Sequence, residues 1–200
     1  MTRTAWLLLP WLILLGVAAG LLLAETGHHV FPAHTVSTGV ARIGGPFQLM
    51  DQDGVARRDS DFRGRYLLIY FGYSHCPDVC PTTLSDIAGA YDRLGARKTK
   101  VVPVFVTLDP GRDTPKVIKT YLAAFGPEFV GLTGTDDAIA RVANEYRASY
   151  RVRALPEGGY ALDHSSAIYL MGPDGRFIAF YEDEAGPGTL AADLRKKIPG

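Results

Sequence analysis

The sequence has only two cysteines among its 200 residues, Cys76 and Cys80. Two cysteines exclude a disulfide-stapled scaffold, and they are too few for a four-cysteine zinc site. Charge of one sign is also missing, because 21 basic residues balance 21 acidic ones, so no net field attracts nucleic acid. Hydrophobic residues make up 47% of the chain, which is enough for a packed core. The length allows one domain, or at most two small ones.

One segment near the N-terminus is apolar throughout. Residues 4–24 contain no charged side chain, and as a helix this run would be about 31 Å long, close to the thickness of a bilayer's hydrocarbon core. A cleaved signal peptide is the alternative, but its apolar region is shorter and it ends in a better cleavage site. We therefore predict a transmembrane anchor at residues 1–24. Because Arg3 is the only charge before the run, the rest should be exported, which favours a single-pass protein of the bacterial inner membrane with its C-terminal domain in the periplasm.

Small and polar residues without a clear period follow the predicted anchor. We interpret residues 25–44 as a linker. Its three histidines, His28, His29 and His34, could bind metal, but a solvated linker is the simpler interpretation. Residues 45–200 are then the folded domain.

The domain alternates strand-like and helix-like patterns. Strands are expected at 45–54 (turning at Asp53–Gly54), 65–72, 101–108, 129–132, 166–171 and 176–181, and helices at 81–94, 114–126, 135–146 and 189–197. Pro103 argues against a fully paired central position for its strand. Alternating elements favour a mostly parallel sheet, to which the last two strands add a hairpin. We predict an α/β fold with a mixed sheet flanked by helices, as in the thioredoxin fold.

The two cysteines lie between the buried strand at 65–72 and the helix that follows it. Functional groups gather at the carboxyl ends of strands in α/β sheets, and a helix N-terminus favours the thiolate. Helical side chains four residues apart have Cβ atoms about 5–6 Å from each other, whereas a disulfide needs about 3.5–4.5 Å. Pro81 disfavours helical geometry at Cys80, so we expect a turn-like loop with the helix starting near Pro81. Such a loop could switch between dithiol, disulfide and metal-bound forms.

A metal site would need a third ligand, and His164 is the candidate. It lies directly before the strand at 166–171, in a loop that a thioredoxin-like layout places against the cysteines. Two thiolates and one imidazole suit Cu(I). Asp163 could orient the imidazole, and His75 is a rival ligand. A plain structural disulfide and an ordinary hydrogen-bonded histidine remain the alternatives.

Four motifs occur in order along the domain. They are FGYSHCPDVCPTTL at 71–84, DPGRDTP at 109–115, GLTG at 131–134 and DHSS at 163–166. From about Gly45 to the C-terminus, the chain thereby resembles the Sco/SenC family of copper proteins. The resemblance implies a thioredoxin-like fold, Cys76, Cys80 and His164 as copper ligands, and the two cysteines as a redox pair.

The second motif contributes no ligand in this comparison. We expect Arg112 and Asp113 to fix a loop beside the site, with Asp113 capping the helix that begins at Thr114.

The resemblance also implies a function. The protein would be a membrane-tethered copper metallochaperone that assists maturation of the Cu(A) centre of cytochrome c oxidase, with copper bound as Cu(I) or as Cu(II). Its partners would be the oxidase subunit that bears Cu(A), and other periplasmic copper chaperones or thiol reductants, but not nucleic acid.

The alternative is a thiol–disulfide oxidoreductase that keeps the Cu(A)-site cysteines reduced. Cys76 would attack a substrate disulfide, and Cys80 would resolve the mixed disulfide. A thiol peroxidase is the third class, but the Pro/Thr-containing segment 81–83 follows the cysteines instead of preceding them.

Overall fold

The computed structural model describes residues 43–182 and 186–200. The predicted anchor at 1–24 and nearly all of the predicted linker at 25–44 lie outside these residues. Within the described ranges, no helix is both long enough and apolar enough to cross a bilayer. Residues Ala41–Gly200 form one compact unit, with a hydrophobic core that runs through its strands and helices.

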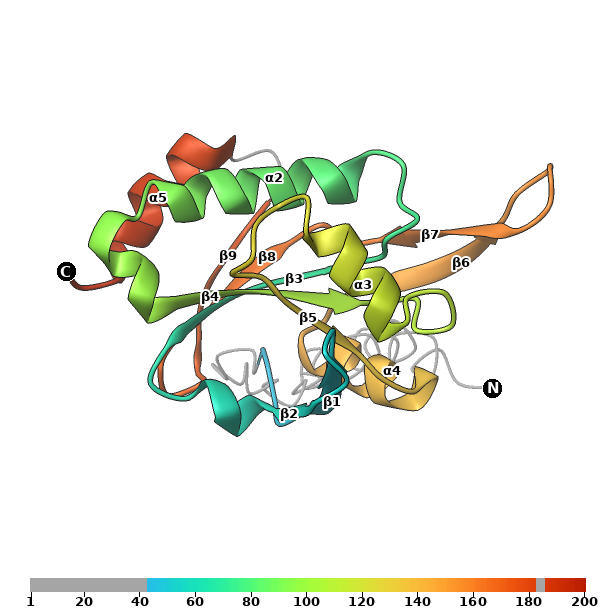
Figure 1. Cartoon of the computed structure of the whole chain (residues 1–200), viewed down its shortest axis with the longest axis horizontal. Coiled ribbons are helices and arrows are strands. Elements are labelled where there is room, and N and C mark those ends of the chain that lie inside the picture. Colours follow the sequence, from blue (N-terminus) through green and yellow to red (C-terminus); the bar gives the residue numbers. More distant parts are fainter. Residues whose placement is uncertain (1–42, 183–185) are drawn as a thin grey trace, which may run out of the picture. The chain divides into compact units, whose positions relative to one another are not determined.

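A seven-stranded mixed sheet forms the centre of this unit, with the strand order β2-β1-β5-β4-β3-β8-β9 (Figure 1). The strands are β1 (Gln48–Asp51), β2 (Ala56–Arg58), β3 (Tyr66–Gly72), β4 (Val101–Thr107), β5 (Val130–Thr133), β8 (Ile168–Met171) and β9 (Phe177–Tyr181). Strands β3, β4 and β5 are parallel, and the outer pairs are antiparallel. A separate ribbon pairs β6 (Tyr150–Ala154) with β7 (Tyr160–His164), and it extends beyond the sheet in Figure 1.

Helices cover both faces of the sheet. They are α2 (Val79–Asp92), α3 (Pro115–Leu122), α4 (Asp136–Glu145) and α5 (Gly186–Lys197), with short 3-10 helices η1 (Asp59–Phe62) and η2 (Gly95–Lys100). Helices α2 and α5 pack together along one side of the sheet (Figure 1). Neighbouring residues of a strand point to opposite faces, so Tyr70 of β3 lies on the α2 side, whereas Phe71 packs against Tyr146 at the end of α4, with ring centroids 5.4 Å apart.

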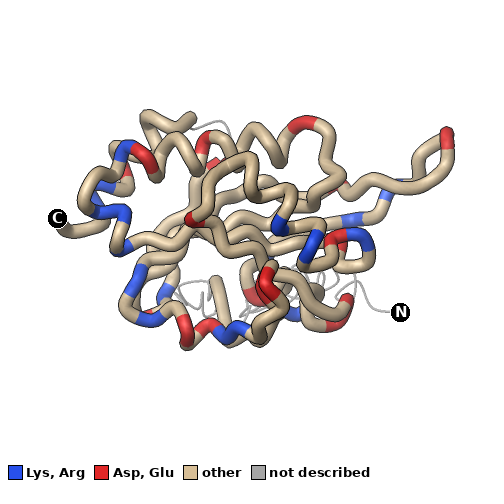
Figure 2. The backbone as a smooth tube through the Cα atoms, in the orientation of Figure 1, with Lys and Arg blue, Asp and Glu red and all other residues tan. Residues whose placement is uncertain are grey.

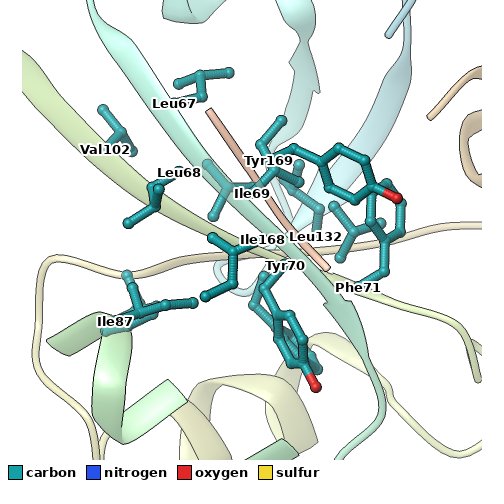
Figure 3. Close-up of a cluster of buried hydrophobic side chains, with 14 of the residues drawn as sticks. Leu67, Leu68, Ile69, Tyr70, Phe71, Ile87, Val102, Leu132, Ile168 and Tyr169 are labelled. Atoms are coloured by element: carbon teal, nitrogen blue, oxygen red, sulfur yellow. The ribbon is translucent and has the colours of Figure 1, made fainter. Parts of the chain in front are cut away.

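The core is densest around β3 and β4, whose continuous apolar runs predicted buried strands. Leu68, Tyr70 and Phe105 are fully buried. Figure 3 shows Ile87 of α2 directed toward the side chains of β3. This packing fixes the carboxyl end of β3, where the cysteine loop begins.

The sequence predicted the starts of α3 and α4 correctly to within one residue. The hydroxyls of Thr114 and Thr135 accept hydrogen bonds from the backbone N–H groups of Val117 and Ala138, and they cap α3 and α4. Helix α2, by contrast, begins at Val79, two residues before Pro81. Its first turn includes Pro81, where a missing N–H costs no helical bond. The expectation of a non-helical Cys80 is therefore wrong.

Two features of the sheet differ from a simple interpretation of the sequence. Pro103 lies in an interior strand, but β5 pairs only with Val104 to Val106 of β4, so Pro103 has a strand neighbour on one side alone. The ribbon β6–β7 was not predicted. His164 is consequently the last residue of a strand and does not belong to a loop.

Candidate metal centre

The carboxyl end of β3 positions both cysteines. The loop from Tyr73 to Asp78 leads from β3 into α2, and the backbone N–H of Cys76 donates to the carbonyl of Tyr73. Cys80 lies in the first turn of α2 and is fully buried, whereas Cys76 is partly exposed. The Cys80 backbone N–H points at the Cys76 sulfur, 3.5 Å away. The first cysteine therefore faces solvent, while the second lies behind it.

Gly72 allows the buried sulfur to approach the sheet. A Cβ atom at this position would lie 2.9 Å from the Cys80 Sγ and 3.1 Å from the Phe105 ring. Because the first contact is too short for a real Cβ atom and the second is tight, a larger residue at the end of β3 would displace the thiol and crowd the ring. Glycine is required here for space and not for an unusual backbone angle.

The ribbon brings His164 against this pair. Its Nε2 lies 3.3 Å from the Cys80 Sγ, and its Nδ1 lies 2.9 Å from the carbonyl oxygen of Ser165. A carbonyl only accepts, so Nδ1 carries the proton and the Nε2 lone pair is directed at the thiols. The rings of Tyr70 and Tyr73 pack edge-on against the imidazole at 6.3 and 5.9 Å. These two tyrosine rings pack against the imidazole and support its position.

A hydrogen bond between the two thiols shifts their pKa values in opposite directions. A hydrogen bond from the Cys80 thiol, assisted by backbone N–H groups, lowers the pKa of Cys76 to about 3, although burial acts in the opposite direction. The same hydrogen bond and the burial of Cys80 raise the pKa of that thiol well above its ordinary value. At neutral pH the pair therefore carries one thiolate, on the accessible cysteine.

The donor atoms of Cys76, Cys80 and His164 all lie within 4.8 Å of one another. Two ligands that each lie about 2.3 Å from one metal ion are at most about 4.6 Å apart, so the three donors nearly match a shared ion without rearrangement. Two soft sulfurs, one neutral imidazole and an apolar surrounding suit Cu(I), which accepts few ligands. The residues present therefore fit copper.

Two other predicted contributors lie elsewhere. Both oxygens of the Asp163 carboxylate pair with Arg151 and Arg153 of the ribbon, at 3.0 and 3.1 Å, so Asp163 does not orient His164 as expected. The ring of His75 is half-exposed, and its Nδ1 lies 3.0 Å from the Ser74 hydroxyl. His75 is not part of the three-donor cluster.

The expected cap role of Asp113 is wrong, since Thr114 is the cap. The fully buried Asp113 carboxylate instead accepts hydrogen bonds from the Ser74 backbone N–H at 2.9 Å, from the Ser74 hydroxyl at 2.5 Å and from the Thr107 hydroxyl at 2.6 Å. Ser74 is two residues before Cys76. One buried carboxylate thus holds the cysteine loop against the end of β4.

Arg112 joins the loop between β4 and α3 to the ribbon. Its Nε donates to the carboxylate of Asp109, its Nη1 donates to the Tyr160 carbonyl at 3.1 Å, and its guanidinium lies 3.8 Å from the centre of the Tyr160 ring. The Tyr160 hydroxyl donates to Asp109 at 2.8 Å. We call Asp109, Arg112 and Tyr160 the ribbon clamp. It fixes the first residue of the strand whose last residue is His164.

Comparisons with known proteins agree with this site. The family model described as SCO1/SenC matches residues 35–199. The chain belongs to the SCO1/SenC family. It is 38% identical over 181 residues to Protein SenC of Rhodobacter capsulatus, covering 90% of this chain and 82% of that protein. The human "Protein SCO1 homolog, mitochondrial" is 39% identical over 159 residues, covering 78% of this chain and 53% of that protein.

A solved member of the family carries the metal. The structure described as Bradyrhizobium japonicum ScoI with copper bound has a TM-score of 0.72 and 44% identity, covering 77% of this chain and 98% of that chain. The present chain spans about half the length of the human and Arabidopsis thaliana SCO1 homologues that it matches. The mixed sheet flanked by helices is thus the thioredoxin-like fold of this family.

Proposed function

We propose that this SCO1/SenC protein is a membrane-tethered copper metallochaperone that assists maturation of the Cu(A) centre of cytochrome c oxidase. Copper is its cargo, held by Cys76, Cys80 and His164. The observation that carries the proposal is the convergence of two thiols and one imidazole within 4.8 Å, from elements 84 residues apart in the sequence. The copper-bound ScoI relative supports the choice of metal.

The asymmetry of the pair supports transfer. Cys76 is partly exposed and carries the thiolate, so it is the ligand that an incoming or outgoing partner can reach, whereas Cys80 is enclosed. Cargo can then pass by exchange of one ligand at a time, starting at Cys76. The Cu(A)-bearing subunit of the oxidase would be the acceptor.

The domain boundaries form part of the proposal. Residues 1–24 anchor the chain in the bacterial inner membrane, residues 25–44 link it, and residues 45–200 form the copper-binding domain in the periplasm. Tethering raises the effective concentration of the domain at a membrane-bound acceptor. A carbonate wash of membranes tests the anchor, because release of the full-length protein would contradict it.

Copper titration of the fragment 41–200 tests the site. Removal of the imidazole in His164→Ala should weaken copper binding about a hundredfold or more, since a ligand matters at least as much as its supporting contacts. His75→Ala is the matched control, because it removes the other histidine next to the cysteine loop and should bind as the wild type does. Equal copper affinity of the His164→Ala variant and the wild type would contradict the three-ligand site.

A thiol–disulfide oxidoreductase is the second candidate, and the lowered pKa of Cys76 favours it. The Cys76 thiolate would attack a disulfide of the partner, form a mixed disulfide and release one partner thiolate. After losing its proton, Cys80 would attack the Cys76 sulfur and release the second partner thiol. Two electrons pass to the partner, and Cys76 and Cys80 end as a disulfide that an external thiol reductant must reduce.

Variants of His164 and Cys80 distinguish the metallochaperone from the oxidoreductase. Reductase activity needs both cysteines but not the imidazole, so His164→Ala should retain it while losing copper affinity. A Cys80→Ser variant should trap the partner as a mixed disulfide in cells. Absence of such an adduct, together with full rescue of Cu(A) by added copper alone, would count against the reductase.

A further inference from the structure

Basic side chains gather at the end of the domain where the C-terminus lies. The group comprises Arg93, Arg97, Lys98, Lys100, Arg195, Lys196 and Lys197, and we call it the basic pole. A third of the chain's 21 basic residues thus lie in two short segments, although the whole chain is neutral. Figure 2 shows this concentration of blue beside the C label.

Hydrogen bonds join the two segments into one surface. The Arg97 Nε donates to the Ile198 carbonyl at 2.9 Å, and the Arg195 Nη1 donates to the Arg93 carbonyl at 2.9 Å. The Lys100 Nζ donates to a terminal oxygen of Gly200 at 2.7 Å. The ends of α2, η2 and α5 therefore present their charges together.

Nearby carboxylates offset only part of this charge. Asp92 pairs with Lys98 at 2.6 Å, and Asp193 pairs with Lys197 at 3.3 Å. Glu128 is the other acidic side chain whose field reaches the neighbouring Tyr91. Seven basic side chains thus face three acidic side chains and, in the chain as given, the terminal carboxylate of Gly200, so the pole stays positive. Arg93, Arg195 and Lys196 are exposed.

The basic pole and the cysteines lie at opposite ends of the parallel strands. Lys100 directly precedes β4, whose first residue pairs with the first residue of β3. The cysteine loop follows the last residue of β3. A strand of seven residues rises about 3.3 Å per residue, so about 20 Å or more separate the pole from the metal centre.

We infer that the basic pole docks on an anionic phospholipid surface, with the metal centre directed away from the bilayer. The choice of lipid rests on the proposed anchor. An unstructured chain of 20 residues, the length of the proposed linker, spans about 25 Å on average, so the domain would remain close to the bilayer surface. The first residues that the structure describes also lie near the start of β3, which is the end of the strand closer to the basic pole. Gly44 lies against Met171, which pairs with Leu67, the second residue of β3.

Vesicle binding of the fragment 41–200 tests this inference without the anchor. The fragment should sediment with vesicles of phosphatidylcholine containing phosphatidylglycerol, but not with pure phosphatidylcholine, and salt should weaken the binding. The triple variant Arg93→Gln, Arg195→Gln and Lys196→Gln should lose about a hundredfold in partition coefficient, or about fivefold per residue.

A second triple variant is the matched control. Arg58→Gln, Arg141→Gln and Arg176→Gln also remove three exposed positive charges, but these lie outside the basic pole. This variant should bind anionic vesicles nearly as the wild type does. Equal losses in both variants, or no binding of the wild type to anionic vesicles, would overturn the inference. Far-UV circular dichroism and copper titration confirm that each variant is folded.

Orientation gives a second measurement. In a Cys76→Ser and Cys80→Ser background, a thiol introduced by Lys196→Cys should be protected from a bulky maleimide when anionic vesicles are present. In the wild-type fragment, measured separately, Cys76 should react equally fast with and without vesicles, and protection of Cys76 instead would overturn the proposed orientation. Loss of copper binding with lipid binding intact would refute the proposed function and leave this inference standing.

Discussion

Removal of the Asp113 carboxylate should both destabilise the domain and loosen the copper site. In Asp113→Ala, three donors lose a buried acceptor: the Ser74 N–H, the Ser74 hydroxyl and the Thr107 hydroxyl. A hydrogen bond to a charged group contributes about 1.5–3 kcal/mol, so full additivity gives about 5–9 kcal/mol. Both hydroxyls can rotate to other partners, and we therefore expect a loss of about 3–5 kcal/mol in the free energy of unfolding.

The variant Asp113→Asn separates charge from hydrogen bonding. Its one carbonyl oxygen can still accept from the Ser74 N–H and from the Thr107 hydroxyl, and the Ser74 hydroxyl can turn to accept from the new amide. The loss should therefore be smaller, about 1–2 kcal/mol. Urea unfolding of the fragment 41–200 measures both variants.

Copper affinity is the second readout, because Asp113 holds Ser74 and Ser74 leads into Cys76. Asp113→Ala should weaken copper binding about tenfold or more. Thr107→Val is the matched control. It removes a buried bond to the same carboxylate and the acceptor of the Asp109 backbone N–H, but leaves Ser74 held, so it should lower stability without an equal loss of copper affinity. If Asp113→Ala unfolds within about 1 kcal/mol of the wild type and binds copper equally well, the anchoring argument is wrong.

Three further predictions concern single contacts. Gly72→Ala places a Cβ 2.9 Å from the Cys80 sulfur and should cost about 1–3 kcal/mol of stability and most of the copper affinity. The control Gly188→Ala, with no atom near its Cβ, should be neutral or stabilising in the same urea and copper titrations. Arg112→Lys keeps the charge of the ribbon clamp but loses its paired contacts with Tyr160. Copper should bind about tenfold more weakly, and the free energy of unfolding in urea should fall by about 1–2 kcal/mol. Copper affinity equal to that of the wild type would contradict the role of the clamp. Burial acts to raise the pKa of Asp51, but hydrogen bonds from Arg57 and from backbone N–H groups outweigh it and lower that pKa below 3.8. The ionised carboxylate therefore stabilises the fold at pH values above the ordinary pKa of 3.8, and Asp51→Asn should be most destabilising at pH 7 and progressively less so as the pH falls below 4. If the difference in the free energy of unfolding between variant and wild type is constant from pH 7 to pH 3, this reasoning is refuted.

Local sequence patterns were sufficient for the interior of the sheet. Within the predicted strands 65–72 and 101–108, residues 66–71 and 101–106 are apolar without a break, and burial on both faces is what such runs predict. The start of α4 at Thr135 follows from residues of its own turn, as a cap normally does. At the start of α3 the expected cap was Asp113, but tertiary contacts turn Asp113 inward and Thr114 caps the helix instead.

The ribbon β6–β7 gave no comparable signal. Its first strand, Tyr150–Ala154, is almost entirely exposed and carries Arg151 and Arg153, so it has no apolar face whose period could be recognised. The ribbon is held instead by its own cross-strand pairs and by the clamp at Tyr160. The sequence nevertheless predicted that His164 approaches the cysteines, because that expectation came from the order of elements in the fold.

The reacting atoms and the groups that position them differ in how far the sequence reveals them. Cysteines and a histidine carry their chemistry in the side chain itself, so Cys76, Cys80 and His164 stand out from the sequence alone. Asp113 and Arg112 also have near partners, but they reach the site through Ser74 and Tyr160, which lie 39 and 48 residues away from them. A carboxylate next to a helix start is expected to cap it, and only the fold shows that Asp113 turns inward to Ser74. Losses of copper affinity among variants of Asp113, Thr107 and Arg112 should therefore follow the displacement of Cys76 or His164, and not the loss of stability.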